Sequence, residues 1–311
     1  MRFMTMASFP FLPALPGVPG IPGTDNTALD AMFYDIGVLS RAERAQLRHP
    51  GKDEGMILEV GPSWEPSLRV WDSLSQCDNL APRYRAITIA GVGSSALGAA
   101  ALARNAADAL RGPVLGVVSG QGITDIASEA MGGYFLFGGL NAMRHGVNSV
   151  DRTMDAMRAM NPFLFGPSMA SIDPGQGFQL ARFSKDVKAL VALIGGAESG
   201  GVEVDWLVGH SKGNLVISEA LYALRTKDSE RFEAIARGVP IVTFGARIAM
   251  PTQVETVIDV MGDLDGFGAM NSRPDIAVDV TVPGAWHHTN TRLPFHVPVT
   301  KTLERIVRER G

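Results

Sequence analysis

The sequence of 311 residues contains a single cysteine, Cys77. One thiol cannot close an intramolecular disulfide, and it cannot build the multi-cysteine clusters that hold structural zinc. Folding must therefore depend on the burial of apolar side chains, for which a chain of this length is sufficient. A chain without disulfides suits a reducing compartment.

The chain also has no excess of basic over acidic residues. The formal net charge is −4, so the chain lacks the basic footprint of a nucleic-acid-binding protein, and no nucleic-acid partner is expected. No apolar run approaches the roughly 20 residues of a membrane helix, and the stretch MGGYFLFGGL (131–140) is too short. The N-terminus runs from Met1 into prolines without the apolar core of a signal peptide, so we expect a cytoplasmic protein with no transmembrane segment.

Hydrophobic residues make up 46% of the chain and charged residues 19%, a balance typical of globular proteins. We expect an N-terminal arm over residues 1–30 and one domain over 31–311. Within the arm, residues 9–23 (FPFLPALPGVPGIPG) alternate apolar residues with proline and glycine. Proline fixes φ and removes a donor, so this arm should be extended. It either lies on the domain or contacts a hydrophobic surface or a partner subunit.

From residue 85 onward, short apolar runs alternate with helix-like segments. The pattern predicts buried strands at 86–90, 113–119, 202–208, 239–244, 254–261 and 276–282, and helices at 94–111, 123–130, 184–195, 214–225 and 299–310. Such alternation is typical of an α/β fold, a mostly parallel central sheet flanked by helices. The stretch 151–183 is rich in proline and glycine and fits no regular element, so we expect a lid-like insertion at about 131–183.

One short motif carries chemistry. Gly209, Ser211 and Gly213 fit the pattern G-x-S-x-G, between the expected strand VEVDWLV and the expected helix NLVISEALYAL. In α/β-hydrolases this pattern forms the nucleophile elbow, a sharp turn that presents the serine hydroxyl at the start of a helix. Side chains at either glycine would collide with neighbouring elements, and the helix dipole favours a developing negative charge. Ser211 is therefore the candidate nucleophile, and the alternative is a glycine-rich turn with an incidental serine.

Three segments resemble α/β-hydrolase lipases, in particular the class 3 lipases: VDWLVGHSKGN, VPIVTFGARIAMP and VETVIDVMGDLDGFG. The likeness covers the chain from about Ala86 to the C-terminus, and it implies an α/β-hydrolase fold with a Ser–His–Asp triad. The chain departs from that family at 212–214, which read Lys-Gly-Asn where Leu-Gly-Gly is usual. It departs again at Ala246-Arg247, where the proline is missing. These departures concern the subfamily and the substrate more than the mechanism.

The acid and the base of this fold follow the nucleophile in the order serine, carboxylate, histidine. Asp263 comes directly after the expected strand 254–261, at the end where loops build the site, and the lipase resemblance points to it as well. Asp263 is therefore the preferred acid. Asp265 is the alternative, and Asp259 within the strand is expected to be structural.

Three histidines follow the acid in the chain. His296, in LPFH, is similar to the turn that carries the catalytic histidine in class 3 lipases, and it is the preferred base. His287, in GAWH, resembles the Gly-x-Gly-His segment after the last strand of many α/β-hydrolases and is the alternative, with His288 as a third candidate. A metal site made of these three histidines would lack an acidic ligand, so no metal is expected.

Backbone amides should stabilise the oxyanion. One donor is the N–H of Lys212, the residue after the nucleophile, and the second is expected at Val92, with Gln121 as the alternative. The glycines around Val92 also fit G-x-G-x-x-A, the dinucleotide-binding fingerprint, over residues 91–96. The next strand ends in VVSG without the acidic residue that would hold a ribose, so this alternative is the weaker one.

These residues predict a carboxylic ester hydrolase that works through an acyl-enzyme intermediate and needs no cofactor. An apolar lid would suit a small-molecule, lipid or polyester substrate. Two other functions remain open at this point. One is a non-catalytic binding module on the same fold, and the other is an acyltransferase or polyester depolymerase.

Overall fold

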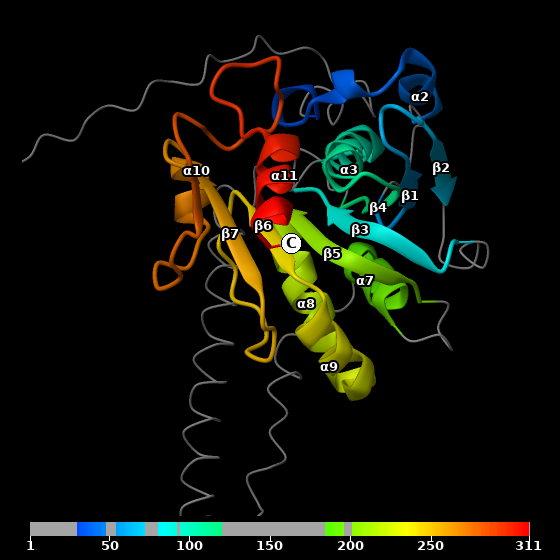
Figure 1. Cartoon of the computed structure of the whole chain (residues 1–311), viewed down its shortest axis with the longest axis vertical. Coiled ribbons are helices and arrows are strands. Elements are labelled where there is room, and N and C mark those ends of the chain that lie inside the picture. The colour runs from blue at the N-terminus through cyan, green and yellow to red at the C-terminus, as the bar shows by residue number, and fades with distance from the viewer. Residues whose placement is uncertain are drawn as a thin grey trace, which may run out of the picture.

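The structure, a computed structural model, describes residues 30–47, 54–71, 80–91, 94–119, 184–195 and 201–310. The expected arm up to residue 29, the expected helix 123–130 and the expected lid at 131–183 lie outside these residues. The described part of the chain forms a sheet of eight strands in the order β2-β1-β4-β3-β5-β6-β7-β8 (Figure 1).

The strands are β1 (Ile57–Val60), β2 (Leu68–Trp71), β3 (Arg83–Ile89), β4 (Val114–Val117), β5 (Glu203–His210), β6 (Ile241–Phe244), β7 (Val257–Gly262) and β8 (Val280–Val282). The six neighbouring strands from β4 to β8 in the sheet run parallel. β1 is antiparallel to both β2 and β4. The expected mostly parallel α/β sheet is therefore confirmed.

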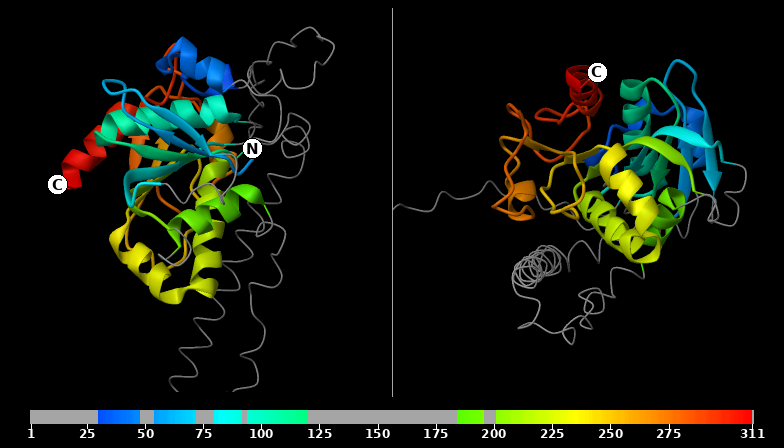
Figure 2. Two further views of the ribbon diagram at one scale, coloured as in Figure 1. Left: turned by 90° about the vertical axis from the view of Figure 1, so that its right-hand side faces the viewer. Right: turned by 60° about the horizontal axis from the view of Figure 1, so that its bottom comes forward.

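Helices cover both faces of the sheet (Figure 2). α3 (Ala96–Leu110) and α11 (Val299–Arg310) lie on one face, whereas α7 (Lys185–Ile194), α8 (Lys212–Lys227) and α9 (Ser229–Gly238) lie on the other. Each face has its own apolar core, because successive side chains of a strand point to opposite faces. In β6, Val242 and Phe244 join the core beneath α3 and α11, and Ile241 joins the core beneath α7 to α9.

Three short elements complete the described part: η1 (Ile36–Val38), α2 (Arg41–Gln46) and α10 (Gly266–Met270). α2 begins with a capping box between Ser40 and Glu43. Arg104 of α3 donates to the Glu43 carboxylate at 2.5 Å, and its side chain is almost fully buried. This ion pair fastens α2 to α3.

None of the helices in the described ranges is both long and apolar enough to cross a lipid bilayer.

Asp259 is a buried carboxylate inside β7, as the sequence analysis expected of a structural residue. Its exposed fraction is 3%, and it accepts a hydrogen bond from the hydroxyl of Thr243 on β6. Burial, together with the nearby Asp279, raises the pKa of Asp259 to about 6, although the Thr243 bond opposes the shift. The folded state therefore holds the proton more tightly than the unfolded state does.

The raised pKa of Asp259 predicts a pH-dependent stability. Its contribution to the free energy of unfolding is fully present below the unfolded pKa near 3.8 and is lost as the pH rises through about 6. We expect Asp259→Asn to be more stable than the wild type by about 2 kcal/mol at pH 7.5, and the two to converge near pH 4. Urea unfolding at both pH values measures this difference. Asp263→Asn, which alters an exposed carboxylate just after β7, is the matched control. Parallel stability curves for Asp259→Asn and the wild type would contradict the prediction.

Candidate active site

Ser211 occupies the sharp turn between β5 and α8. Its φ of +54° is unusual for a residue with a side chain, and its N–H donates to the carbonyl of Phe244 on β6 at 2.8 Å. A Cβ at Gly213 would lie 2.1 Å from the carbonyl oxygen of Ile89, and Gly209 is packed as closely against α8. Gly213 is therefore required by the backbone of β3 and Gly209 by Asn214 of α8, in agreement with the G-x-S-x-G pattern.

Ser211, His287 and Asp265 form a hydrogen-bonded row. His287 Nε2 lies 3.1 Å from Ser211 Oγ, and His287 Nδ1 lies 2.8 Å from Asp265 Oδ2. A carboxylate only accepts hydrogen bonds, so Nδ1 carries the proton and Nε2 presents its lone pair to the serine hydroxyl. The exposed fractions of the three residues are 5%, 2% and 3%. This is the geometry of a nucleophile, a base and an acid that orients the base.

The structure brings Asp265, the alternative acid, to His287, and it does not bring Asp263 there. β7 ends at Gly262, so Asp263 begins the following turn and is exposed. Asp265 is the N-cap of α10, where its Oδ1 accepts the N–H of Gly268 at 2.6 Å. Both carboxylate oxygens of Asp265 thus accept hydrogen bonds. The bond to Oδ1 fixes the direction in which Oδ2 faces the imidazole.

The histidine beside Ser211 also differs from the preferred candidate, His296. His296 turns its Nδ1–H to the carbonyl of Leu293 at 3.0 Å, and His288 donates from Nε2 to the carbonyl of Pro294 at 2.9 Å. Both histidines therefore form hydrogen bonds within the loop that follows β8. Burial lowers the pKa of His288, in agreement with a neutral ring. Of the three candidate histidines, only His287 reaches Ser211 Oγ.

The turn after β6 packs against the His287 ring. Gly245 has a φ of +70°, and a Cβ there would lie 3.0 Å from Cε1 of the His287 ring. Asn214 of α8 holds this turn, because its amide donates to the carbonyls of Phe244 at 3.0 Å and Ala246 at 2.9 Å. Asn214 is one of the residues in which the chain departs from the lipase pattern, and its side chain gives that departure a structural role.

Lys212 is the first residue of α8, so its N–H belongs to the helix-terminal amides that have no partner within the helix. The expected second oxyanion donors, Val92 and Gln121, lie outside the described residues. The Lys212 side chain is buried, with its ammonium 3.7 Å from a carboxylate oxygen of Asp186 on α7. Asp186 also accepts the hydroxyl hydrogen of Ser119 at 3.0 Å. The charged pair thus joins the starts of α7 and α8.

A carboxylate occupies the place where the dinucleotide alternative needs a phosphate. The buried carboxylate of Asp30 lies at the N-terminus of α3, where it accepts the N–H of Ser95 at 3.0 Å and the Ser95 hydroxyl. A pyrophosphate would need this same helix terminus. A Cβ at Gly91 would lie 2.9 Å from Cβ of Ser211, so the elbow itself explains the first glycine of the motif.

Across the described ranges, no group of three or more His, Cys, Asp or Glu residues is arranged to hold a metal ion.

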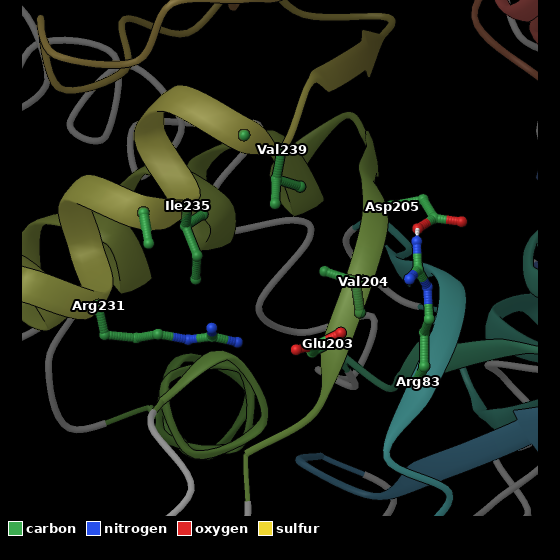
Figure 3. A pocket seen from close by; sticks show the side chains of 9 residues that line it. Arg83, Glu203, Val204, Asp205, Arg231, Ile235 and Val239 are labelled. Carbon is green, nitrogen blue, oxygen red and sulfur yellow. Dashed lines mark hydrogen bonds and ion pairs between the residues drawn. The ribbon is translucent and has the colours of Figure 1, made fainter.

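A surface hollow lies at the opposite end of the sheet (Figure 3). Its lining residues include Arg83 and Glu203, the first residues of β3 and β5, whereas Ser211 follows the last residue of β5. Eight strand residues separate the two places, or roughly 25 Å. Arg83 donates to Asp205 at 2.6 Å, and Arg231 donates to two backbone carbonyls. Arg83, Asp205 and Arg231 thus have structural partners, and the hollow is no part of the Ser211 site.

The packing of Gly213 predicts a large effect of one methyl group. We expect Gly213→Ala to lower the free energy of unfolding by about 2–4 kcal/mol, because its Cβ would meet backbone atoms of β3 that cannot move away alone. Gly238→Ala is the matched control, since it ends another helix with open space around the new Cβ. Its stability should stay within about 1 kcal/mol of the wild type. Chemical denaturation of both variants measures the contrast, and equal effects would refute the steric explanation.

Comparison of the chain with protein-family models, with curated proteins and with solved structures gives no match in any of the three. The likeness of its elbow to class 3 lipases therefore stays a prediction from the motif. What the chain does must be inferred from the geometry of its own residues.

Proposed function

We propose that the protein is a serine hydrolase that cleaves carboxylic esters. The observation that carries this proposal is the row of hydrogen bonds from Ser211 Oγ through both nitrogens of His287 to the Asp265 carboxylate. The positive φ of Ser211 at a strand-to-helix turn supports it further, because strained nucleophile geometry is costly and is kept where it serves a site.

The reaction follows from the protonation states. His287 Nε2 takes the proton of Ser211 as Oγ attacks the ester carbonyl, and the C–O π electrons move onto the oxygen. The Lys212 N–H at the start of α8 stabilises that oxyanion. The tetrahedral intermediate collapses, His287 protonates the departing alkoxide, and an acyl-Ser211 remains. Water then attacks with His287 again as base, which releases the carboxylic acid and restores the serine. Asp265 keeps the proton on Nδ1 throughout.

The alternative of a non-catalytic binding module requires a serine without a base in reach, and the 3.1 Å contact with His287 argues against it. Acyl transfer and polyester cleavage use the same acyl-Ser211 and differ only in the acceptor or in the length of the substrate. Small-molecule, lipid and polyester esters are therefore the substrates to compare.

The triad geometry predicts which variants lose activity. We expect Ser211→Ala and His287→Ala to lower kcat for p-nitrophenyl esters by about 10⁴-fold or more, and Asp265→Asn by about 10³- to 10⁴-fold. His296→Ala and Asp263→Asn should stay within about threefold of the wild type, because neither side chain touches the row. A series of acyl chain lengths, with melting curves for each variant, provides the measurement.

Labelling with a fluorophosphonate tests the nucleophile without a natural substrate. The wild type should be labelled on Ser211, whereas Ser211→Ala should not. Adding a primary alcohol to the ester assay separates acyl transfer from hydrolysis, because transfer yields a new ester. A folded wild type that neither turns over esters nor reacts with the label would overturn the proposal and favour the binding module.

A further inference from the structure

A buried chain of hydrogen bonds runs behind the candidate nucleophile. The N–H of Gly91 lies 2.6 Å from Tyr34 Oη, Tyr34 Oη lies 2.9 Å from His210 Nδ1, and His210 Nε2 lies 2.9 Å from the carbonyl oxygen of His287. The carbonyl of His287 only accepts, so Nε2 of His210 carries a proton, and Nδ1 of the neutral ring is an acceptor. Tyr34 therefore accepts from Gly91 and donates to His210, and His210 donates to the backbone of His287.

The chain requires a neutral His210, because a protonated ring would have no lone pair for the tyrosine hydroxyl. Burial, followed by the neighbouring His287, lowers the pKa of His210 to about 3. Tyr34 and His210 are each 2% exposed, and their rings meet edge to face at 5.4 Å. The arrangement therefore persists across the pH range in which an esterase is assayed.

The same region joins three parts of the proposed site. Gly91 follows β3, packs against Ser211, and leads into the loop where the second oxyanion donor is expected. The carbonyl of Phe33, next to Tyr34, accepts both the N–H and the hydroxyl of Thr289 at 2.7 and 3.0 Å. The Phe33 ring stands edge-on to the His287 imidazole at 6.1 Å. The segment around Tyr34 thus contacts Gly91, His210 of the elbow and the His287 imidazole.

We infer that Tyr34 and His210 are positioning residues of the Ser211 site. They touch no reacting atom. They set the distance between Gly91, which follows β3, and the backbone of His287. Ser211 lies between the two. The inference rests on the proposed hydrolase function. It assigns a task to His210, the variable residue of the G-x-S-x-G motif, and to a tyrosine that the sequence analysis did not single out.

Tyr34→Phe tests this role, with Tyr84→Phe as its matched control. Both tyrosines are buried, at 2% and 1% exposure, and each hydroxyl accepts a backbone N–H, from Gly91 and Ala81 respectively. Tyr84 lies at the amino end of β3, far from Ser211. We expect similar losses in melting temperature. Only Tyr34→Phe should lower kcat, by about 10- to 100-fold with KM nearly unchanged, because misplaced catalytic groups slow the chemical step.

Two further measurements report on the geometry of the site separately from ester turnover. The rate of fluorophosphonate labelling reports on Ser211, and imidazole NMR resonances report on His210 and His287 without any substrate. Both should change in Tyr34→Phe and stay as in the wild type in Tyr84→Phe. If Tyr34→Phe does not fold, His210→Gln carries the test, since glutamine keeps a donor and an acceptor but loses the rigid ring. His210→Gln should lower kcat, by less than the fall expected for Tyr34→Phe.

A wild type that is inert to esters and to the label would overturn the proposed hydrolase, whatever the variants do. A wild type that is active, with Tyr34→Phe and His210→Gln equal to it in kcat and labelling rate, would overturn the positioning role alone. Unchanged imidazole resonances in Tyr34→Phe would also overturn that role, independently of catalysis.

Discussion

The backbone of Ser211 adopts a positive φ, which for a residue with a side chain costs about 1–3 kcal/mol, and the surrounding contacts hold it there. The Ser211 N–H is bonded to β6, and Gly213 leaves no room between α8 and β3. The first turn of α8, the ends of two strands and the turn after β6 are thus fixed relative to one another. The His287 ring, which lies 3.1 Å from Ser211 Oγ, packs against the turn after β6.

The central part of the fold could be predicted from the sequence. The buried parallel strands are continuous apolar runs followed by helices, and this pattern gave β3 to β7 and α3, α7, α8 and α11 within a few residues. β1 and β2 were missed, since the antiparallel edge they form carries polar residues and has no helix between its strands. The expected strand 276–282 shrinks to the three residues of β8, which pairs on one side only, with β7.

The sharp turn at Ser211 could be predicted because the G-x-S-x-G motif states a local backbone requirement. The choice between Asp263 and Asp265 depends on where the turn after β7 ends, and that is set by hydrogen bonds to distant loops. The sequence carried no signal that separates the two, because each aspartate is followed three residues later by a glycine, Gly266 for Asp263 and Gly268 for Asp265. Only the structure shows that Asp265 caps α10 and is thereby buried and oriented. The choice of His287 over His296 likewise had no local signal, because it depends on the hydrogen bonds within the loop that follows β8.

The contacts of the segment around Tyr34 join residues that are very far apart in the chain. Tyr34 and His210 are separated by 176 positions, and Phe33 and Thr289 by 256. Contacts of such long range form late in folding, because a large loop must close before they are made. The same tyrosine also bonds to Gly91, 57 positions away, so its contacts close one moderate loop and one large loop of the chain at the same place. The native contacts around Ser211 therefore have a high contact order, which predicts slow folding of this part of the chain.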